Sequence, residues 1–177
     1  MTGKVHVICG VSAAVTATIA CPTLNIAGAV IYPAIGILAA FPGSLLPDID
    51  ISQSKMGSKH PWLSKHLKHR GITHTLLLPL LVVGLFILAR TIPILPSLLF
   101  GFEIGYVAHI VADLFNKKGV PLLWPFTSAH LHVACVKTSS KAQQVIFVIF
   151  WEVICLIVIT LRYDLWNTIP AWFSSLG

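Results

Sequence analysis

Five apolar segments dominate the chain and set what it can fold into. They run from about 5 to 20, 26 to 41, 75 to 91, 95 to 115 and 142 to 163. A helix that crosses a bilayer needs ~20 mainly apolar residues, so the first two are expected to extend or tilt. The chain is 56% hydrophobic and only 10% charged, whereas soluble domains are roughly one-quarter charged. The sequence therefore predicts one all-α domain over residues 1–177, a polytopic membrane helix bundle of about five spans.

Proline and glycine mark the expected breaks between these segments. Pro42-Gly43 and Pro93 fall where helices are expected to end, and Thr73 is a candidate N-cap for the third helix. After the fourth segment, residues 116–126 are apolar but contain one glycine and two prolines. Such a segment cannot span alone, because its backbone polar groups would lack partners in lipid. We predict a re-entrant or interfacial loop there.

The first segment also has features of a secretory signal peptide, since Lys4 precedes an apolar run that ends at Cys21. His6 lies where such a peptide should be apolar, and Pro22 follows the cysteine. We therefore expect a retained helix. The four cysteines show no CxxC spacing and are expected to be small hydrophobic residues rather than disulfide or metal partners.

Positive charges predict the orientation. With five spans, the N-terminus and the loops at 47–74 and 116–141 share one side of the membrane. That side carries ten Lys and Arg residues, whereas the other side carries only Arg90 and Arg162. Cytoplasmic loops are enriched in Lys and Arg. We therefore predict a multi-pass membrane protein whose N-terminus and two large loops are cytoplasmic, and assign the formal charge of +6 to this asymmetry rather than to nucleic-acid binding.

Seven Asp and His side chains are expected at the cytoplasmic end of the bundle: His6, Asp48, Asp50, His69, His74, His109 and Asp113. Asp48 and Asp50 follow Pro47 in a turn, and His109 and Asp113 share one helix face at i, i+4. Imidazole and carboxylate ligands suit Zn²⁺, with Mn²⁺ or Fe²⁺ as alternatives. The shared depth favours a metal site for one or two ions.

Each part of this pattern also has an ordinary explanation. A lone His6 is often an interfacial residue, and a His/Asp pair at i, i+4 is often only hydrogen-bonded. His69 and His74 alone could be part of a cationic loop near anionic lipid. Four further histidines are expected to be solvated surface residues: His60, His66, His130 and His132.

Two acids fall deeper in the predicted membrane region, Glu103 in the fourth segment and Glu152 in the fifth. Ionisable groups at such positions are costly and usually functional, or else neutral and hydrogen-bonded. Glu103 is a candidate for lining a substrate cavity or orienting a metal ligand. A protonated structural glutamic acid is the alternative.

Three ordered blocks carry a family resemblance: LLPDID at 45–50, HRGITHT at 69–75 and GYVAHIVADLFNKKGVPLLWPF at 105–126. In these blocks the chain resembles the YdjM-type family of bacterial inner-membrane proteins, described as membrane-bound metal-dependent hydrolases. The resemblance implies that the seven Asp and His positions are polar positions that the family shares. The chain departs from the family pattern at Ile51 and Ser52, where His-Pro is usual, and at Asn116, where Thr is usual.

These observations lead to a hydrolase hypothesis. Asp48, Asp50 and Glu103 are the candidate catalytic residues, with Asp48 or Asp50 as the bridge between two ions. A site at headgroup depth favours a lipid or lipid-linked phosphoester as substrate, and Arg70 is the candidate phosphate-binding residue. Membrane lipids are the expected partners, no nucleic-acid motif is present, and the sequence leaves the oligomeric state open.

The sequence is also compatible with two other functions. In the first, the chain transports metal ions or protons, with Glu103 and Glu152 extending a polar path through the bundle. The outer halves of the spans offer no further acid or histidine for such a path. In the second, the metal site is purely structural and holds the helices together without catalysis.

Overall fold

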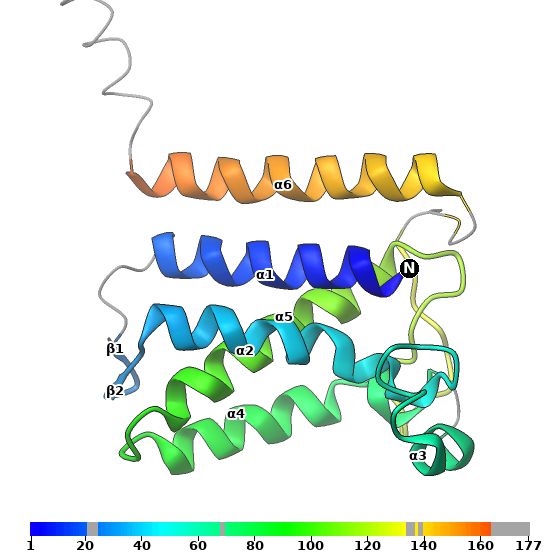
Figure 1. Cartoon of the computed structure of the whole chain (residues 1–177), viewed down its shortest axis with the longest axis horizontal. Coiled ribbons are helices and arrows are strands. Elements are labelled where there is room, and N and C mark those ends of the chain that lie inside the picture. The colour runs from blue at the N-terminus through cyan, green and yellow to red at the C-terminus, as the bar shows by residue number, and fades with distance from the viewer. Residues whose placement is uncertain (21–24, 68–69, 134–136, 138–139, 164–177) are drawn as a thin grey trace, which may run out of the picture.

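The structure is a computed structural model that describes residues 1–20, 25–67, 70–133, 137 and 140–163. Five apolar helices form the bundle (Figure 1): α1 (Gly3–Ala20), α2 (Pro33–Leu45), α4 (Leu77–Ala89), α5 (Leu95–Leu114) and α6 (Lys141–Tyr163). Short elements connect them: β1 (Asn25–Ile26), β2 (Ala29–Val30), the 3₁₀ helix η1 (Leu46–Asp50), α3 (Pro61–His66) and the 3₁₀ helix η2 (Ile72–His74). The all-α membrane bundle predicted from the sequence is confirmed.

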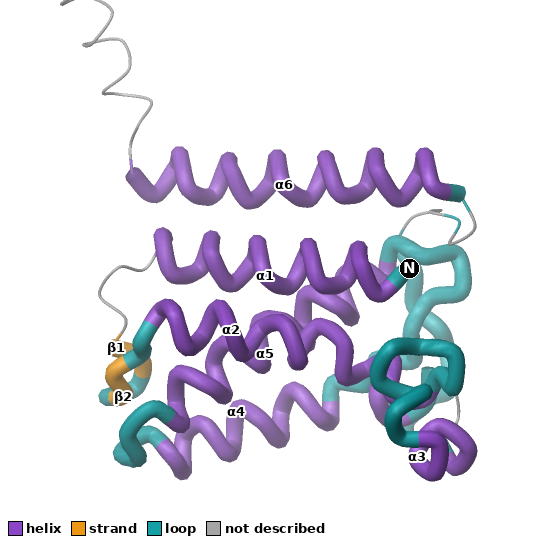
Figure 2. Tube along the Cα trace, in the orientation of Figure 1, coloured by secondary structure: helices purple, strands orange, loops and turns teal. Residues whose placement is uncertain are grey.

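Successive long helices run in alternating directions (Figures 1 and 2). The N-terminus, η1, α3, η2 and the start of α6 lie at one end of the bundle, which we call the loop end. The β1–β2 hairpin and the turn between α4 and α5 lie at the opposite end. Segments that the sequence places on one side of the membrane therefore gather at one end of the bundle.

Three helices are long and apolar enough to cross a membrane, namely Gly3–Ala20, Leu95–Leu114 and Lys141–Arg162. α2 and α4 have 13 residues each. α2 is shorter than its apolar segment because the chain first turns through the β1–β2 hairpin, with Ala27 and Gly28 at positive φ. The helix then starts at Pro33, whose fixed φ suits the first turn.

Two expected helix boundaries are wrong. Pro42 lies inside α2, which continues through Gly43 to Leu45. Thr73 lies in η2 rather than capping α4, and its hydroxyl donates to the carboxylate of Asp50. Both differences extend ordered backbone toward the loop end, where the acidic and histidine side chains lie.

α2 and α5 make the most extensive helix contact of the bundle. A Cβ added to Gly101 would collide with the carbonyl oxygen of Gly36, and one added to Gly105 would collide with that of Ala40. Small residues four apart on both helices therefore let the two backbones approach closely, which is a common way for helices to pack in membranes. This contact fixes the end of α2 against the last turns of α5.

α6 packs on the outer side of α1 (Figure 1). Phe147 is buried against Val5 and Cys9 of α1, and the indole N–H of Trp151 donates to the hydroxyl of Ser12 at 3.2 Å. The segment at 116–126 is not helical; it turns back so that Val120 pairs with Leu131 in an antiparallel bridge.

Candidate metal centre

The loop end collects six of the seven predicted metal ligands, and His69 lies outside the described residues. His6 comes from the second turn of α1, and Asp48 and Asp50 come from η1. His74 ends η2, and His109 and Asp113 lie in the last turns of α5. All six side chains are buried. Residues distant in sequence thus meet where these helices end, as the predicted topology requires.

His109 is held in one orientation by the backbone of α2. Its Nδ1 lies 2.7 Å from the carbonyl oxygen of Ser44, and a carbonyl can only accept, so Nδ1 carries the proton. Nε2 then presents its lone pair. This nitrogen is buried without a hydrogen-bond partner and lies 3.7 Å from Oδ1 of Asp48. Two groups that both accept hydrogen bonds face each other across a gap that a cation would fill.

The imidazole of His6 completes this part of the site. It stacks on His109 with ring centroids 3.7 Å apart and an angle of 15° between the planes. Both ring nitrogens of His6 are buried without a hydrogen-bond partner. An unpaired buried polar atom costs ~1–3 kcal/mol. The donor set therefore fits a group that accepts lone pairs, as a divalent metal ion does.

Asp48 brings a carboxylate to the edge of this cluster. Burial raises the pKa of Asp48 to about 6, and the nearby negative charge of Asp113 adds to the shift. Both effects act against the ionised form, whereas a positive ion beside the carboxylate would favour it. Asp48 is thus a buried acid whose ionised form needs a cation nearby.

Two groups of three side chains have ligand atoms within 4.8 Å of one another: His6, Asp48 and His109, and His74, His109 and Asp113. Metal–nitrogen and metal–oxygen bonds of ~2.0–2.2 Å place neighbouring ligand atoms about 3–4 Å apart. Contacts of 3.5 Å from His6 to Asp113 and 3.8 Å from His74 to Asp113 lie in this range. His109 belongs to both groups but has only one available nitrogen, so it can bind one ion at a time.

His74 is oriented by a chain of hydrogen bonds. The Thr73 hydroxyl donates to Oδ2 of Asp50 at 2.9 Å, so it must accept from Nδ1 of His74, which lies 3.0 Å away. Nε2 of His74 is thereby left with its lone pair on the side of Asp113. Asp50 belongs to neither ligand group, and the structure places it behind His74, where such partners orient metal-binding imidazoles.

Asp113 is surrounded by positive groups. Its Oδ1 accepts from the amino group of Met1 at 2.8 Å, and its Oδ2 accepts from Nη2 of Arg70 at 2.7 Å. Arg70 also donates to the carbonyl oxygen of Gly119 and, through its backbone N–H, to Asp50. Arg70 therefore links η1, α5 and the 116–126 loop around the site. The contact between Arg70 and a substrate phosphate, expected from the sequence, stays a prediction.

Glu103 lies away from this cluster. It belongs to neither ligand group and lines a cavity of about 280 Å³ between α4 and α5, with Val82 and Phe86. Its Oε2 is buried without a hydrogen-bond partner. A catalytic role for Glu103 stays a prediction. The four histidines expected at the surface, His60, His66, His130 and His132, are exposed.

Three supporting residues were not identified from the sequence: Ser44, Thr73 as a hydrogen-bonding residue, and Tyr106. The Tyr106 hydroxyl donates to the carbonyl oxygen of Thr73 and so fixes η2 against α5. Ser44 acts through its backbone carbonyl, which no side-chain pattern reveals. A polar residue directly before a predicted ligand, as Thr73 is before His74, was the one available signal.

Comparisons with known proteins identify a family and relatives that this chain resembles. The family model described as YdjM inner membrane protein matches residues 1–174. The "Inner membrane protein YdjM" of Escherichia coli (strain K12) is 42% identical over 89 residues, which cover 46% of this chain and 44% of that protein. The matched region thus spans less than half the length of that relative. "Uncharacterized protein YvsG" of Bacillus subtilis (strain 168) is 32% identical over 153 residues, covering 82% of this chain and 87% of that protein.

No solved structure matches the chain. The family model covers nearly the whole sequence and includes every residue of the buried Asp and His cluster. The chain therefore belongs to the YdjM family of inner membrane proteins.

Proposed function

We propose that this protein is a membrane-bound metal-dependent hydrolase that acts on a lipid or lipid-linked phosphoester. One observation carries the proposal: five buried donor side chains from α1, η1, η2 and α5 converge, and ring nitrogens of His6 and His109 lack hydrogen-bond partners. Buried unpaired imidazoles of this kind are costly unless they bind a proton or a metal. A metal-binding role explains why all of them point to one place.

Three histidines and two carboxylates would hold the ion or ions: His6, Asp48, His74, His109 and Asp113. Mixed imidazole and carboxylate ligands favour Zn²⁺, with Mn²⁺ and Fe²⁺ as alternatives. Because His109 offers one nitrogen, the cluster holds either one ion or two ions that do not share His109. A divalent ion in such a site supplies Lewis acidity and lowers the pKa of a bound water.

The side chains of this protein have separate tasks in the proposed reaction. Asp48 borders both the ligand cluster and an open cleft, so its carboxylate is placed to orient a water molecule and accept its proton. The water oxygen would bond to phosphorus as Asp48 takes one of its protons, the ester P–O bond would break, and the leaving alkoxide oxygen would receive that proton from Asp48. Asp50 contributes by holding His74, and Arg70 by holding Asp113.

The proposed orientation places the loop end and the site at the cytoplasmic face. Ten of the twelve Lys and Arg residues fall on the side of the sequence that contains the N-terminus and both large loops. Such an excess marks cytoplasmic loops. A site at this end of the helices would meet lipid headgroups of the inner leaflet.

Metal content and turnover of the purified full chain test the proposal. Protein in detergent is measured by elemental analysis and then incubated with a panel of phospholipids and lipid-linked phosphates. We expect bound Zn²⁺, Mn²⁺ or Fe²⁺, hydrolysis that EDTA abolishes, and recovery on adding back Zn²⁺ or Mn²⁺. His60→Ala is the matched control, because His60 is an exposed histidine outside the cluster.

Two results would contradict the proposal in different ways. Protein without any divalent transition metal, and without affinity for one, would remove the metal site itself. Protein that binds metal but hydrolyses no phosphoester would leave the site structural, as in the second alternative derived from the sequence.

A further inference from the structure

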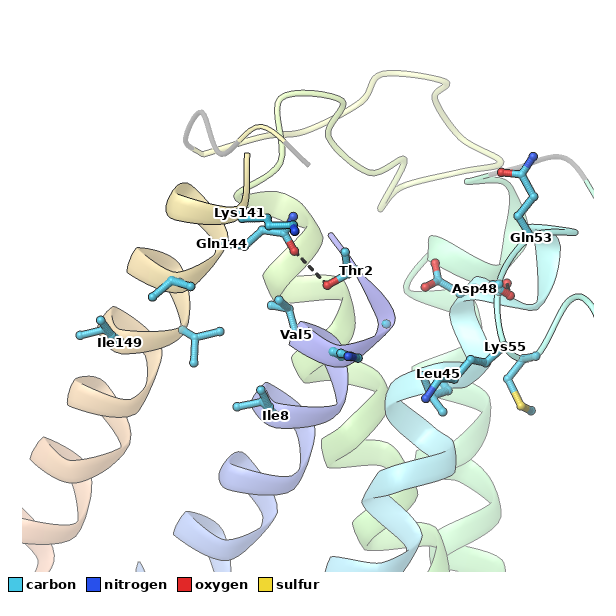
Figure 3. A pocket seen from close by; sticks show the side chains of 16 residues that line it. Thr2, Val5, Ile8, Leu45, Asp48, Gln53, Lys55, Lys141, Gln144 and Ile149 are labelled. Carbon is cyan, nitrogen blue, oxygen red and sulfur yellow. Dashed lines mark hydrogen bonds between the residues drawn. The ribbon is translucent and has the colours of Figure 1, made fainter. Parts of the chain in front are cut away.

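A cleft of about 690 Å³ opens beside the metal-ligand cluster at the loop end (Figure 3). One wall is the first turns of α6, the other is the segment at 53–56 with Leu45 and Asp48, and the start of α1 lies between them. The hydroxyl of Thr2 donates to the side-chain oxygen of Gln144 at 2.9 Å and ties α1 to α6 at the mouth. The cleft is thus formed by three separate parts of the chain.

The two halves of this cleft differ in chemistry. Val5 and Ile8 of α1 and Ile149 of α6 line the part that runs along the helices (Figure 3). These two helices meet the length and composition of membrane spans, so this half faces the depth of the acyl chains. Lys141 lies at the end nearer the loops, and Lys55 lies level with Leu45 on the opposite wall.

The lysines that line the cleft form no ion pair with an acid among the described residues. Lys4, Lys55 and Lys141 line it, and none of their ammonium groups has an ion-pair or hydrogen-bond partner among the described residues. The acid that also lines the cleft is Asp48, which faces His109 of the ligand cluster. Three ammonium groups beside apolar side chains complement a molecule with an anionic head and a hydrocarbon tail.

We propose that this cleft is the binding site for a membrane phospholipid, with its anionic headgroup lying between Lys4, Lys55 and Lys141 and an acyl chain lying along Ile8 and Ile149. Asp48 is shared by the cleft and by the group His6, Asp48 and His109. The phosphoester of a lipid seated in this way therefore lies beside the candidate metal centre. The assignment of this lipid as substrate rests on the proposed function, whereas the binding site itself does not.

Arg70 and the lysines of the cleft have different roles. Arg70 is buried and occupied by Asp113 and the carbonyl of Gly119, and it does not line the cleft. Lys55 and Lys141 are exposed at the cleft. The lysines are the headgroup contacts, and Arg70 is a positioning residue for Asp113.

Lipid binding to the full-length protein in detergent, followed by native mass spectrometry, tests the inference. The probes are dioleoyl phosphatidylglycerol and dioleoylglycerol, which has the same chains but no phosphate. We expect Lys55→Gln/Lys141→Gln to weaken phosphatidylglycerol binding about tenfold and to leave dioleoylglycerol binding unchanged. The control Lys59→Gln/Lys65→Gln has the same net charge and alters exposed lysines that do not line the cleft.

A separate variant tests the apolar part of the cleft. Ile149→Trp fills this part and is expected to weaken binding of both lipids severalfold, whereas Ile146→Trp changes an exposed α6 residue that does not line the cleft. Equal losses in cleft and control variants would overturn the inference in favour of diffuse surface attraction. Full competition by inorganic phosphate would overturn it in favour of a site for free phosphate.

Binding and turnover separate this inference from the proposed function. Both are measured on EDTA-treated and Zn²⁺-loaded protein. Cleft-dependent binding without any turnover supports the lipid site and contradicts the hydrolase. Metal-dependent turnover that is unchanged in Lys55→Gln/Lys141→Gln and in Ile149→Trp supports the hydrolase and overturns the lipid site.

Discussion

The imidazole of His6 lies flat against that of His109, with ring centroids 3.7 Å apart. One ring comes from the start of α1 and the other from the end of α5. The ring of His6 is buried, and neither of its nitrogens has a hydrogen-bond partner. Packing alone would favour an apolar pair here, because apolar residues of similar volume avoid the cost of unpaired polar atoms. The arrangement is one that could hold a metal ion.

The first prediction concerns metal content. We expect His109→Ala to lower the metal content of the purified protein to the background level, because His109 belongs to both ligand groups. Elemental analysis of protein purified without added metal measures this. His60→Ala is expected to keep the wild-type content, since His60 is exposed. Wild-type metal content in His109→Ala would mean that the ion is bound elsewhere.

The second prediction concerns metal removal. A ligand at about a thousand times its Kd stabilises the folded state by ~4 kcal/mol, and each kcal/mol shifts the Tm of a chain of this size by ~2–4 °C. We expect EDTA to lower the melting temperature in detergent by roughly 10 °C. Zn²⁺ should restore it and Mg²⁺ should not, because Mg²⁺ disfavours imidazole ligands. An unchanged melting temperature would contradict a tightly held ion.

The helices, and the end of the bundle at which the Asp and His residues gather, were predicted from the sequence more accurately than the contacts between those residues. The predicted apolar segments end within a residue or two of the observed ends of α5 and α6. Long apolar runs form helices in lipid because few other structures satisfy their backbone hydrogen bonds there. The hairpin at Asn25–Val30 was missed, since its turn depends on positive φ at Ala27 and Gly28. The alternating topology is sufficient to bring His6, His109 and Asp48 to one end.

The separate roles of the residues in the cluster could not be predicted from the sequence. Asp48 and Asp50 are equivalent as a pattern, yet only Asp48 belongs to a ligand group, while Asp50 accepts from Thr73 and Arg70. That difference depends on the rotation of η1, a single 3₁₀ turn. The role of Arg70 depends likewise on a backbone at φ 57°, a conformation that sequence patterns seldom indicate for arginine.

The third prediction tests the hydrogen-bond chain behind His74. Thr73→Val keeps the shape of the side chain but removes the hydroxyl that joins Asp50 to Nδ1 of His74. Loss of such a partner typically weakens metal binding by 10–100-fold, and we expect a change of about tenfold in the Kd for Zn²⁺, measured by competition with a chelating dye. Thr73→Ser restores the hydroxyl and should restore affinity. Equal affinity in Thr73→Val would show that His74 is oriented by packing alone.

The fourth prediction concerns orientation in the membrane. Ser58 is exposed in the segment between η1 and α3, which lies at the loop end, and Thr91 is exposed in the turn between α4 and α5, which lies at the opposite end. In cells expressing variants whose four native cysteines are replaced by alanine, a membrane-impermeant maleimide should label Thr91→Cys. Ser58→Cys should react only after the membrane is permeabilised, because the loop end carries most of the positive charge. Labelling of Ser58→Cys in intact cells would reverse the assignment.

The last prediction connects helix packing to the metal centre. A side chain at Gly101 would collide with the backbone of Gly36, and the α2–α5 contact holds η1, with Asp48, beside His109. We therefore expect Gly101→Leu to separate α2 from α5, lower the melting temperature and weaken Zn²⁺ binding at least tenfold, because ligands must be held within fractions of an ångström. Gly84→Leu is the matched control: it also replaces a helical glycine in an apolar helix, but no atom lies near its added Cβ. Gly84→Leu should keep the wild-type melting temperature and affinity. Normal Zn²⁺ affinity in Gly101→Leu would show that the donor set assembles without the close approach of α2 and α5.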